Sequence, residues 1–94
     1  MRHTTIEVLS TPACAACVAT KIEMTAAGID FREVRAAVDP VAAADLMARF
    51  AAANGGASGM TAPLVLVSDD DGQVLDSWRG RPGAVVERIM TITA

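Results

Sequence analysis

The cysteine pair Cys14 and Cys17 constrains this chain more than any other feature, because it stands between two segments of different structural type. Residues 5–9, before the pair, are β-branched and apolar with a polar position between them, which predicts a β-strand. Residues 15–27, which include the second cysteine, are good helix formers. The pair is therefore predicted to lie where a first strand passes into a first helix.

A structural role explains the spacing of the two cysteines poorly. A bridge between them would close a loop too short to remove much entropy from the unfolded chain. Secreted disulfide scaffolds carry more cysteines than the two present here. A closed zinc site needs four ligands, and the chain has one histidine, His3, and no second cysteine pair. We expect chemistry here, with no metal and no cofactor; zinc shared between chains and two inert core cysteines are the structural alternatives.

The expected place at a helix start gives the pair a chemical logic. Unpaired backbone N–H groups and the positive end of the helix dipole stabilise a thiolate there, and such settings lower a thiol pKa from about 8.5 to roughly 3.5–7.5. The thiolate is the species that attacks a disulfide. Cys14 is thus the candidate nucleophile. Cys17, one helical turn later and expected to be more buried, is the candidate resolving thiol.

The remaining elements follow from periodicity and from turn residues. The apolar stripe of the first helix is assigned to Val18, Ile22 and Ala26. Residues 29–35 alternate and predict a second strand, with Glu33 on the same side as Ile29 and Phe31. A second helix is predicted from Asp39 as N-cap and Pro40 as first helical residue, ending after residue 53. Its apolar stripe is Ala43, Leu46, Met47 and Phe50.

The C-terminal part predicts a hairpin and a last helix. Residues 64–67 form a continuous apolar run typical of a buried central strand. The Asp-Asp-Asp-Gly cluster at 69–72 predicts a turn, and residues 73–78 predict the strand beside it. The last helix is marked by Val85, Val86, Ile89 and Met90.

The predicted order is β-α-β-α-β-β-α in a single α/β domain covering residues 1–94. Two strands that flank a helix are expected to be parallel with a right-handed crossover, whereas the two hairpin strands are antiparallel. A four-stranded mixed sheet with helices on both faces describes the thioredoxin fold in its minimal, glutaredoxin-like form. This fold class is the prediction for the whole chain.

Composition excludes several classes of function. Hydrophobic residues make up 52% of the 94 residues, which suits a real core, and no apolar run approaches the roughly 20 residues of a membrane span. The net charge of −3 with mixed signs argues against a nucleic-acid partner. The N-terminal residues lack the pattern of a signal peptide. We therefore expect a cytoplasmic, monomeric protein with neither a nucleic-acid nor a membrane partner.

Two segments resemble the glutaredoxin-like redoxins. The first is Thr11-Pro12-Ala13-Cys14-Ala15-Ala16-Cys17, which is similar to the active-site segment of that family. The second is Thr61-Ala62-Pro63, which is similar to its Thr-Val-Pro segment. The resemblance implies that Pro63 is cis and faces the cysteines, and that the backbone before it pairs with substrate like an added strand. It implies substrate-binding roles for Thr11, Pro12, Thr61, Ala62, Pro63, Arg79, Gly80 and Arg81.

A third segment, Trp78-Arg79-Gly80-Arg81-Pro82, is similar to the Trp-Ser-Gly-Phe-Arg-Pro signature of the NrdH-redoxins, although one residue shorter. Glutathione-using glutaredoxins instead tend to carry two glycines and an aspartate here, and this chain has no acid between Gly80 and Glu87. The resemblance therefore implies a redoxin that reduces a protein disulfide, such as that of a ribonucleotide reductase, and is re-reduced by thioredoxin reductase. A glutathione-dependent glutaredoxin and a non-catalytic binding module are the alternatives.

Other residues have plainer interpretations. Lys21, four residues after the second cysteine, is expected to be a solvated helix lysine, with a reach toward the thiolate as the alternative. Trp78 and the methionines are expected to pack in the core. Arg79 and Arg81 are expected near the substrate groove, where they could meet a carboxylate of the partner or be solvated.

Overall fold

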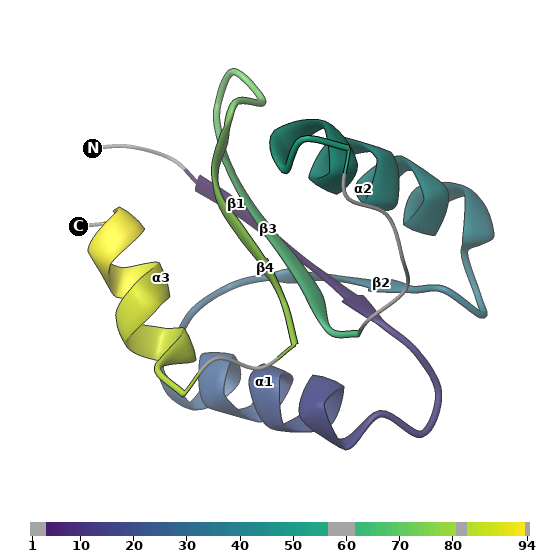
Figure 1. The fold of residues 1–94 in the computed structure, drawn as a ribbon. Coiled ribbons are helices and arrows are strands. Elements are labelled where there is room, and N and C mark those ends of the chain that lie inside the picture. The colour runs from purple at the N-terminus through teal and green to yellow at the C-terminus, as the bar shows by residue number, and fades with distance from the viewer. Residues whose placement is uncertain (1–3, 57–61, 81–82, 94) are drawn as a thin grey trace.

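The computed structural model describes residues 4–56, 62–80 and 83–93, and within them a four-stranded sheet carries helices on both faces (Figure 1). The elements are β1 (Thr4–Ser10), α1 (Ala15–Ala26), β2 (Arg32–Arg35), α2 (Pro40–Ala53), β3 (Leu64–Asp69), β4 (Val74–Arg79) and α3 (Val85–Thr93). The predicted order of strands and helices is confirmed.

The strands lie in the order β2-β1-β3-β4. β1 and β2 are parallel, and the other two pairs are antiparallel. In the register, Ser10 pairs with Arg35, Leu9 pairs with Leu64, and Leu64 pairs with Arg79. The C-terminal ends of β1, β2 and β4 therefore meet the N-terminal end of β3 at one edge of the sheet. This edge, called the site edge below, leads into the Cys14–Cys17 segment.

Two cores lie on opposite faces of the sheet. One is formed under α1 and α3 and contains Met24, Val65, Val67 and Ile89 among others. The other lies under α2 and contains Leu46, Phe50, Leu64 and Leu66 among others. Successive residues of β3 enter opposite cores because side chains alternate along a strand. A central strand covered on both faces needs the continuous apolar run that the sequence shows.

The prediction for α1 is wrong about which face it buries. The buried residues are Cys17, Thr20 and Met24, whereas Val18 and Ile22 are exposed. The disulfide partner Cys17 has to lie inward, and the residues three and seven positions later share its face of the helix. Because the middle residue of this buried face, Thr20, is polar, the face has no apolar stripe in the sequence.

The second strand is shorter than the predicted residues 29–35. The Ile29 N–H donates to the Met24 carbonyl at 2.9 Å, so this residue still completes the end of α1, where Gly28 takes a φ of +72°. Ile29 and Phe31 lie on one side of the sheet as predicted, and they pack against the core under α1 and α3. Strand pairing with β1 begins only at Arg32.

The predictions for α2 are confirmed. Asp39 caps the helix, and its carboxylate accepts from the Ala42 N–H at 3.0 Å. Its predicted apolar positions are buried at Ala43, Leu46 and Phe50 and partly buried at Met47.

The predictions for the tryptophan and the methionines are confirmed in part. Trp78, Met24 and Met47 pack in the cores as expected, but Met90 is exposed, which corrects the expectation for that methionine.

Candidate functional site

The segment between β1 and α1 turns the chain sharply before the cysteines. Ala13 adopts the left-handed conformation with a φ of +56°. This conformation costs a residue with a side chain roughly 1–2 kcal/mol. Cys14 follows with extended backbone angles and is the N-cap of α1, since its carbonyl accepts from the Val18 N–H at 3.2 Å. The turn thus places a cysteine where a helix leaves its first N–H groups unpaired.

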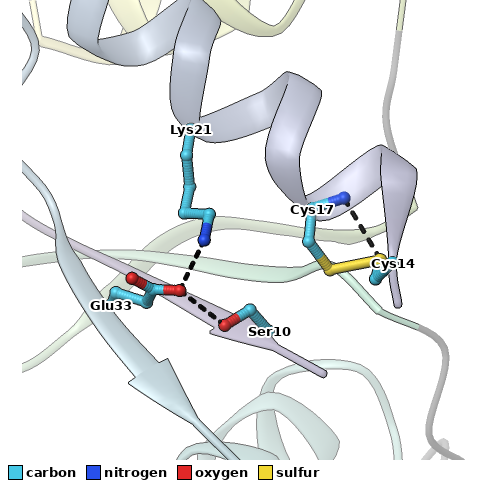
Figure 2. Close-up of a disulfide and its surroundings, with 5 residues drawn as sticks. All are labelled: Ser10, Cys14, Cys17, Lys21 and Glu33. Carbon is cyan, nitrogen blue, oxygen red and sulfur yellow. Dashed lines mark hydrogen bonds and ion pairs between the residues drawn. A yellow bond between two sulfur atoms is a disulfide. The ribbon is translucent and has the colours of Figure 1, made fainter. Parts of the chain in front are cut away.

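The two cysteines form a disulfide in which their environments differ (Figure 2). Their Cα atoms are 5.3 Å apart. The Cys17 N–H donates to Cys14 Sγ at 3.1 Å, so the sulfur takes the role that a serine or aspartate oxygen has in other caps. Cys14 is half-buried, whereas Cys17 is fully buried. Cys14 is therefore the more accessible of the two cysteines, and Cys17 is enclosed by the protein.

A pocket of about 600 Å³ lies beside the disulfide. Residues of α1, of the turn before it and of the end of β2 with the loop that follows form its walls. The walls are apolar at Pro12, Val18 and Val38 and charged at Lys21, Glu33 and Arg35. Both cysteines and Thr11 contribute to the lining as well. Cys14 is therefore reached from a concave surface.

Glu33, a residue of the pocket lining, connects β2 to α1 and β1 through its hydrogen bonds (Figure 2). Its Oε2 accepts from Lys21 Nζ at 2.6 Å and from Ser10 Oγ at 2.8 Å, and Arg35 Nε lies 3.7 Å from the same oxygen. The hydrogen bond from Lys21, and then that from Ser10, lowers the pKa of the Glu33 carboxyl against the opposing effect of burial. The Glu33 carboxyl therefore stays ionised beside the Lys21 side chain.

This arrangement corrects the expectation that Lys21 is simply solvated, because its ammonium group is tied to a carboxylate on the neighbouring strand. Glu33 and Ser10 were not among the predicted site residues. The signal available was the alternation of residues 29–35, which places Glu33 on the face that α1 covers. A carboxylate on a helix-covered face needs a cationic partner, and Lys21 is that partner.

The predicted substrate-binding residues lie mostly at the site edge. The Ala62–Pro63 peptide bond is cis, as the resemblance implied, and Pro63 is buried just before β3. The Gly80 N–H donates to the Pro63 carbonyl at 2.8 Å, which joins the end of β4 to this segment. Arg79 places its guanidinium 4.9 Å from the centre of the Phe50 ring, toward α2. Thr61 and Arg81 lie outside the described residues.

Two further expectations concern metal and membrane. Within residues 4–56, 62–80 and 83–93, no three His, Cys, Asp or Glu side chains come together in a way that could hold a metal ion. Among the helices of the same residues, none has the length and apolar character needed to cross a membrane.

Comparison with known proteins adds evidence on the fold. No family model matches the sequence, and no curated protein does either. Among solved structures, 18 chains match. The crystal structure of the thioredoxin-like protein BC3987 is 23% identical, covers 94% of this chain and 99% of its own, and has a TM-score of 0.52. The chain has the thioredoxin fold.

Two more solved structures agree with this assignment. A mutant of BC3987 is 22% identical over 96% of this chain and 100% of its own, with a TM-score of 0.53. StoA from Bacillus subtilis is 15% identical over 98% of this chain and 83% of its own, with a TM-score of 0.54. At these identities the similarity establishes the architecture, and the closer relation to NrdH-redoxins remains a prediction from the sequence.

Proposed function

We propose that the protein is a thiol–disulfide oxidoreductase that reduces disulfides of other proteins through Cys14 and Cys17. The observation that carries this proposal is the cap of α1. Cys14 Sγ accepts the Cys17 N–H at 3.1 Å, and Cys14 is half-buried while its disulfide partner Cys17 is fully buried. The cap N–H and the helix dipole would stabilise negative charge on this sulfur once the bond is reduced.

The reaction follows from this asymmetry. In the dithiol form, the Cys14 thiolate attacks one sulfur of a substrate disulfide, forms a mixed disulfide and releases one substrate thiolate, which takes up a proton. Cys17 then loses its proton and attacks Cys14 Sγ. That step forms the Cys14–Cys17 bond and releases the second substrate thiolate, which is protonated in turn. Two electrons and two protons pass to the substrate, and the protein ends in the disulfide form of Figure 2.

The finer assignment is a redoxin that serves a protein disulfide such as that of a ribonucleotide reductase. The reductant would be a thioredoxin-reductase-type flavoenzyme, and the setting a reducing compartment such as the cytoplasm. Two sequence features support this: the segment at 78–82 resembles that of NrdH-redoxins, and no acidic residue follows Gly80 before Glu87 to hold the α-amino group of glutathione. The protein would act as a monomer.

The test is turnover of insulin disulfides with two electron sources, thioredoxin reductase with NADPH and glutathione with its reductase. We expect turnover with the first, abolished in Cys14→Ser, and a trapped mixed disulfide in Cys17→Ser. Turnover with glutathione and its reductase, together with no turnover with thioredoxin reductase, would overturn the assignment of the reductant. A folded wild type that reduces no disulfide after treatment with dithiothreitol would overturn the oxidoreductase proposal and favour a non-catalytic binding module.

A further inference from the structure

Two apolar side chains in the lining of the disulfide pocket are exposed to solvent. Val18, on α1, is 51% exposed, and Val38, in the loop after β2, is 73% exposed. Both line the pocket together with Cys14. Single exposed apolar residues are ordinary, but apolar residues that border one concave surface beside a reactive sulfur mark a contact surface.

The charges of the same pocket are unbalanced. Two cations, Lys21 and Arg35, and one anion, Glu33, are the charged residues in its lining, which leaves one positive charge. The chain as a whole carries −3. Glu33 is held at 2.6 Å by Lys21, while Arg35 lies 3.7 Å away with 66% of its side chain exposed. The guanidinium of Arg35 is thus the cation of this pocket that remains accessible to a partner.

We propose that this pocket is a specificity subsite for the protein segment that flanks the target cysteine, and that it selects a segment with an apolar side chain and a carboxylate. The proposal rests on the proposed function, since the segment arrives as part of a disulfide-bearing partner. The apolar side chain would pack between Val18 and Val38. The carboxylate would pair with Arg35, for which an arginine fork is well suited.

A protein segment is the expected occupant because of how the reaction holds it. The mixed disulfide ties the partner's cysteine to the sulfur of Cys14, which is a residue of the pocket lining. The partner residues one or two positions from that cysteine are then held close to the subsite, since an extended chain spans about 3.3 Å per residue. Their effective concentration at the subsite is therefore high. A lysine of the partner in the position of the carboxylate would be repelled by Arg35 and Lys21. This repulsion makes the protein prefer an acidic flanking segment over a basic one.

The test uses matched peptides and the reduced protein. Each peptide carries one cysteine as a mixed disulfide with thiopyridine, an uncharged leaving group whose release is followed by absorbance. The cysteine is flanked on both sides by Leu-Glu, by Leu-Lys or by Gly-Gln. We expect the Leu-Glu peptide to react about three-fold to five-fold faster than the Leu-Lys peptide at low salt. The difference should shrink at high salt.

Two pairs of variants locate the effect. Arg35→Glu should remove or invert the preference between Leu-Glu and Leu-Lys. Arg32→Glu is the matched control, because Arg32 lies on the same strand, is 63% exposed and is not part of the pocket lining. It changes the net charge equally and should keep the preference. Val38→Ser should slow the Leu-Glu peptide but not the Gly-Gln peptide, and the exposed Val41→Ser is its control.

The outcomes separate the two proposals. If Arg35→Glu and Arg32→Glu rank the peptides alike, or if the wild type shows no preference, the subsite is overturned while the oxidoreductase stands. If the reduced wild type releases thiopyridine from none of the peptides and does not react with dithiodipyridine, the oxidoreductase proposal fails, and the subsite fails with it.

Discussion

Two strand glutamates, Glu7 of β1 and Glu33 of β2, each meet a cation from the helix that covers their face, but they do so in different surroundings. Glu7 is held by both terminal nitrogens of Arg49, at 2.7 Å and 2.8 Å, and its side chain is only 5% exposed. Glu33 is held by Lys21 and Ser10, its side chain is 24% exposed, and it belongs to the lining of the disulfide pocket.

The difference separates a structural ion pair from one that borders a reactive site. A buried carboxylate depends on its partner for stability, because the loss of the partner leaves an unpaired charge away from water. A partly exposed carboxylate loses less, since water replaces the partner. We therefore expect changes at the Glu7 pair to appear in the free energy of unfolding and changes at the Glu33 pair to appear mainly in reaction rates.

The largest effect is expected from Arg49→Met. The substitution leaves the Glu7 carboxylate buried, and among the residues that the structure describes its remaining ion-pair partner is Arg32, at 3.7 Å. We expect a loss of about 3 kcal/mol in the free energy of unfolding, measured by urea denaturation. The double variant Glu7→Gln, Arg49→Met should recover part of that loss. Equal losses in the single and double variants would show that Arg49 acts through something other than Glu7.

A gain in stability is expected from Thr20→Val on the buried face of α1. The Thr20 hydroxyl is fully buried and has no hydrogen-bond partner among the described residues. Replacing it with a methyl group of similar size removes that unpaired group and should add about 1 kcal/mol to the free energy of unfolding. A loss of stability would mean that the hydroxyl has a partner in solution. Val18→Thr, on the exposed face of the same helix, is the control and should change little.

Lys21→Met tests the pocket side of the comparison. Because Lys21 and Glu33 are both about a quarter exposed, we expect the free energy of unfolding to fall by no more than about 1 kcal/mol. The pocket loses one positive charge, so the reaction with an acidic peptide disulfide should slow by about two-fold. Thermal unfolding and stopped-flow kinetics measure the two effects. A large stability loss with unchanged rates would reverse the roles assigned to the two pairs.

The acid side of the stability profile is expected to report on Glu33. Its folded-state pKa is lowered, first by the hydrogen bond from Lys21. It therefore adds stability at pH values above the unfolded-state pKa of about 4.3, and this contribution is lost as the pH falls through the folded-state pKa. In Glu33→Gln the stability should fall less steeply below about pH 4 than in the wild type. The free energies of unfolding are measured by urea denaturation at several pH values. An equal slope against pH below about pH 4 in the wild type and in Glu33→Gln would contradict this prediction.

The smallest effect is expected from Asp45→Asn. Asp45 pairs with Arg49 Nε at 3.0 Å within one turn of α2, but its side chain is mostly exposed. Exposed pairs of this kind contribute about 0.3–0.5 kcal/mol. A loss within that range, beside the large loss in Arg49→Met, would assign the role of Arg49 to Glu7. A loss comparable to that of Arg49→Met would assign it to Asp45 instead.

The helices α1 and α2 show how far the sequence predicted the fold. The cap residue Asp39, Pro40 and an apolar stripe all lie within α2 itself, so its limits and buried face were predictable. In α1 the apolar periodicity predicts that Val18 and Ile22 are buried, but both are exposed. The buried face there consists of Cys17, Thr20 and Met24, and its middle residue is polar. Local periodicity fails in α1 because a cysteine and a threonine occupy two positions of the buried face, so that face carries no continuous apolar stripe.

The residues of the candidate site also differ in how far the sequence predicted them. The spacing of Cys14 and Cys17 and their position between a strand and a helix were expected from the residues, whereas the cis bond before Pro63 was implied by the resemblance to glutaredoxin-like redoxins. The first two are local features, since capping and turns involve residues close in sequence. Glu33, by contrast, is 12 residues from Lys21 and 23 from Ser10, and no local pattern connects them.

The sequence by itself thus determined the order of the elements, the α/β class and the place of the reactive pair, because each depends on short-range patterns of apolar and turn residues. Only the tertiary structure decided which face of α1 is buried, which cation meets which carboxylate, and that Val18, Val38 and Arg35 share one pocket with Cys14. Those contacts join residues from different elements. They exist only once β1 and β2 lie in register and α1 and α2 have packed against the two faces of the sheet.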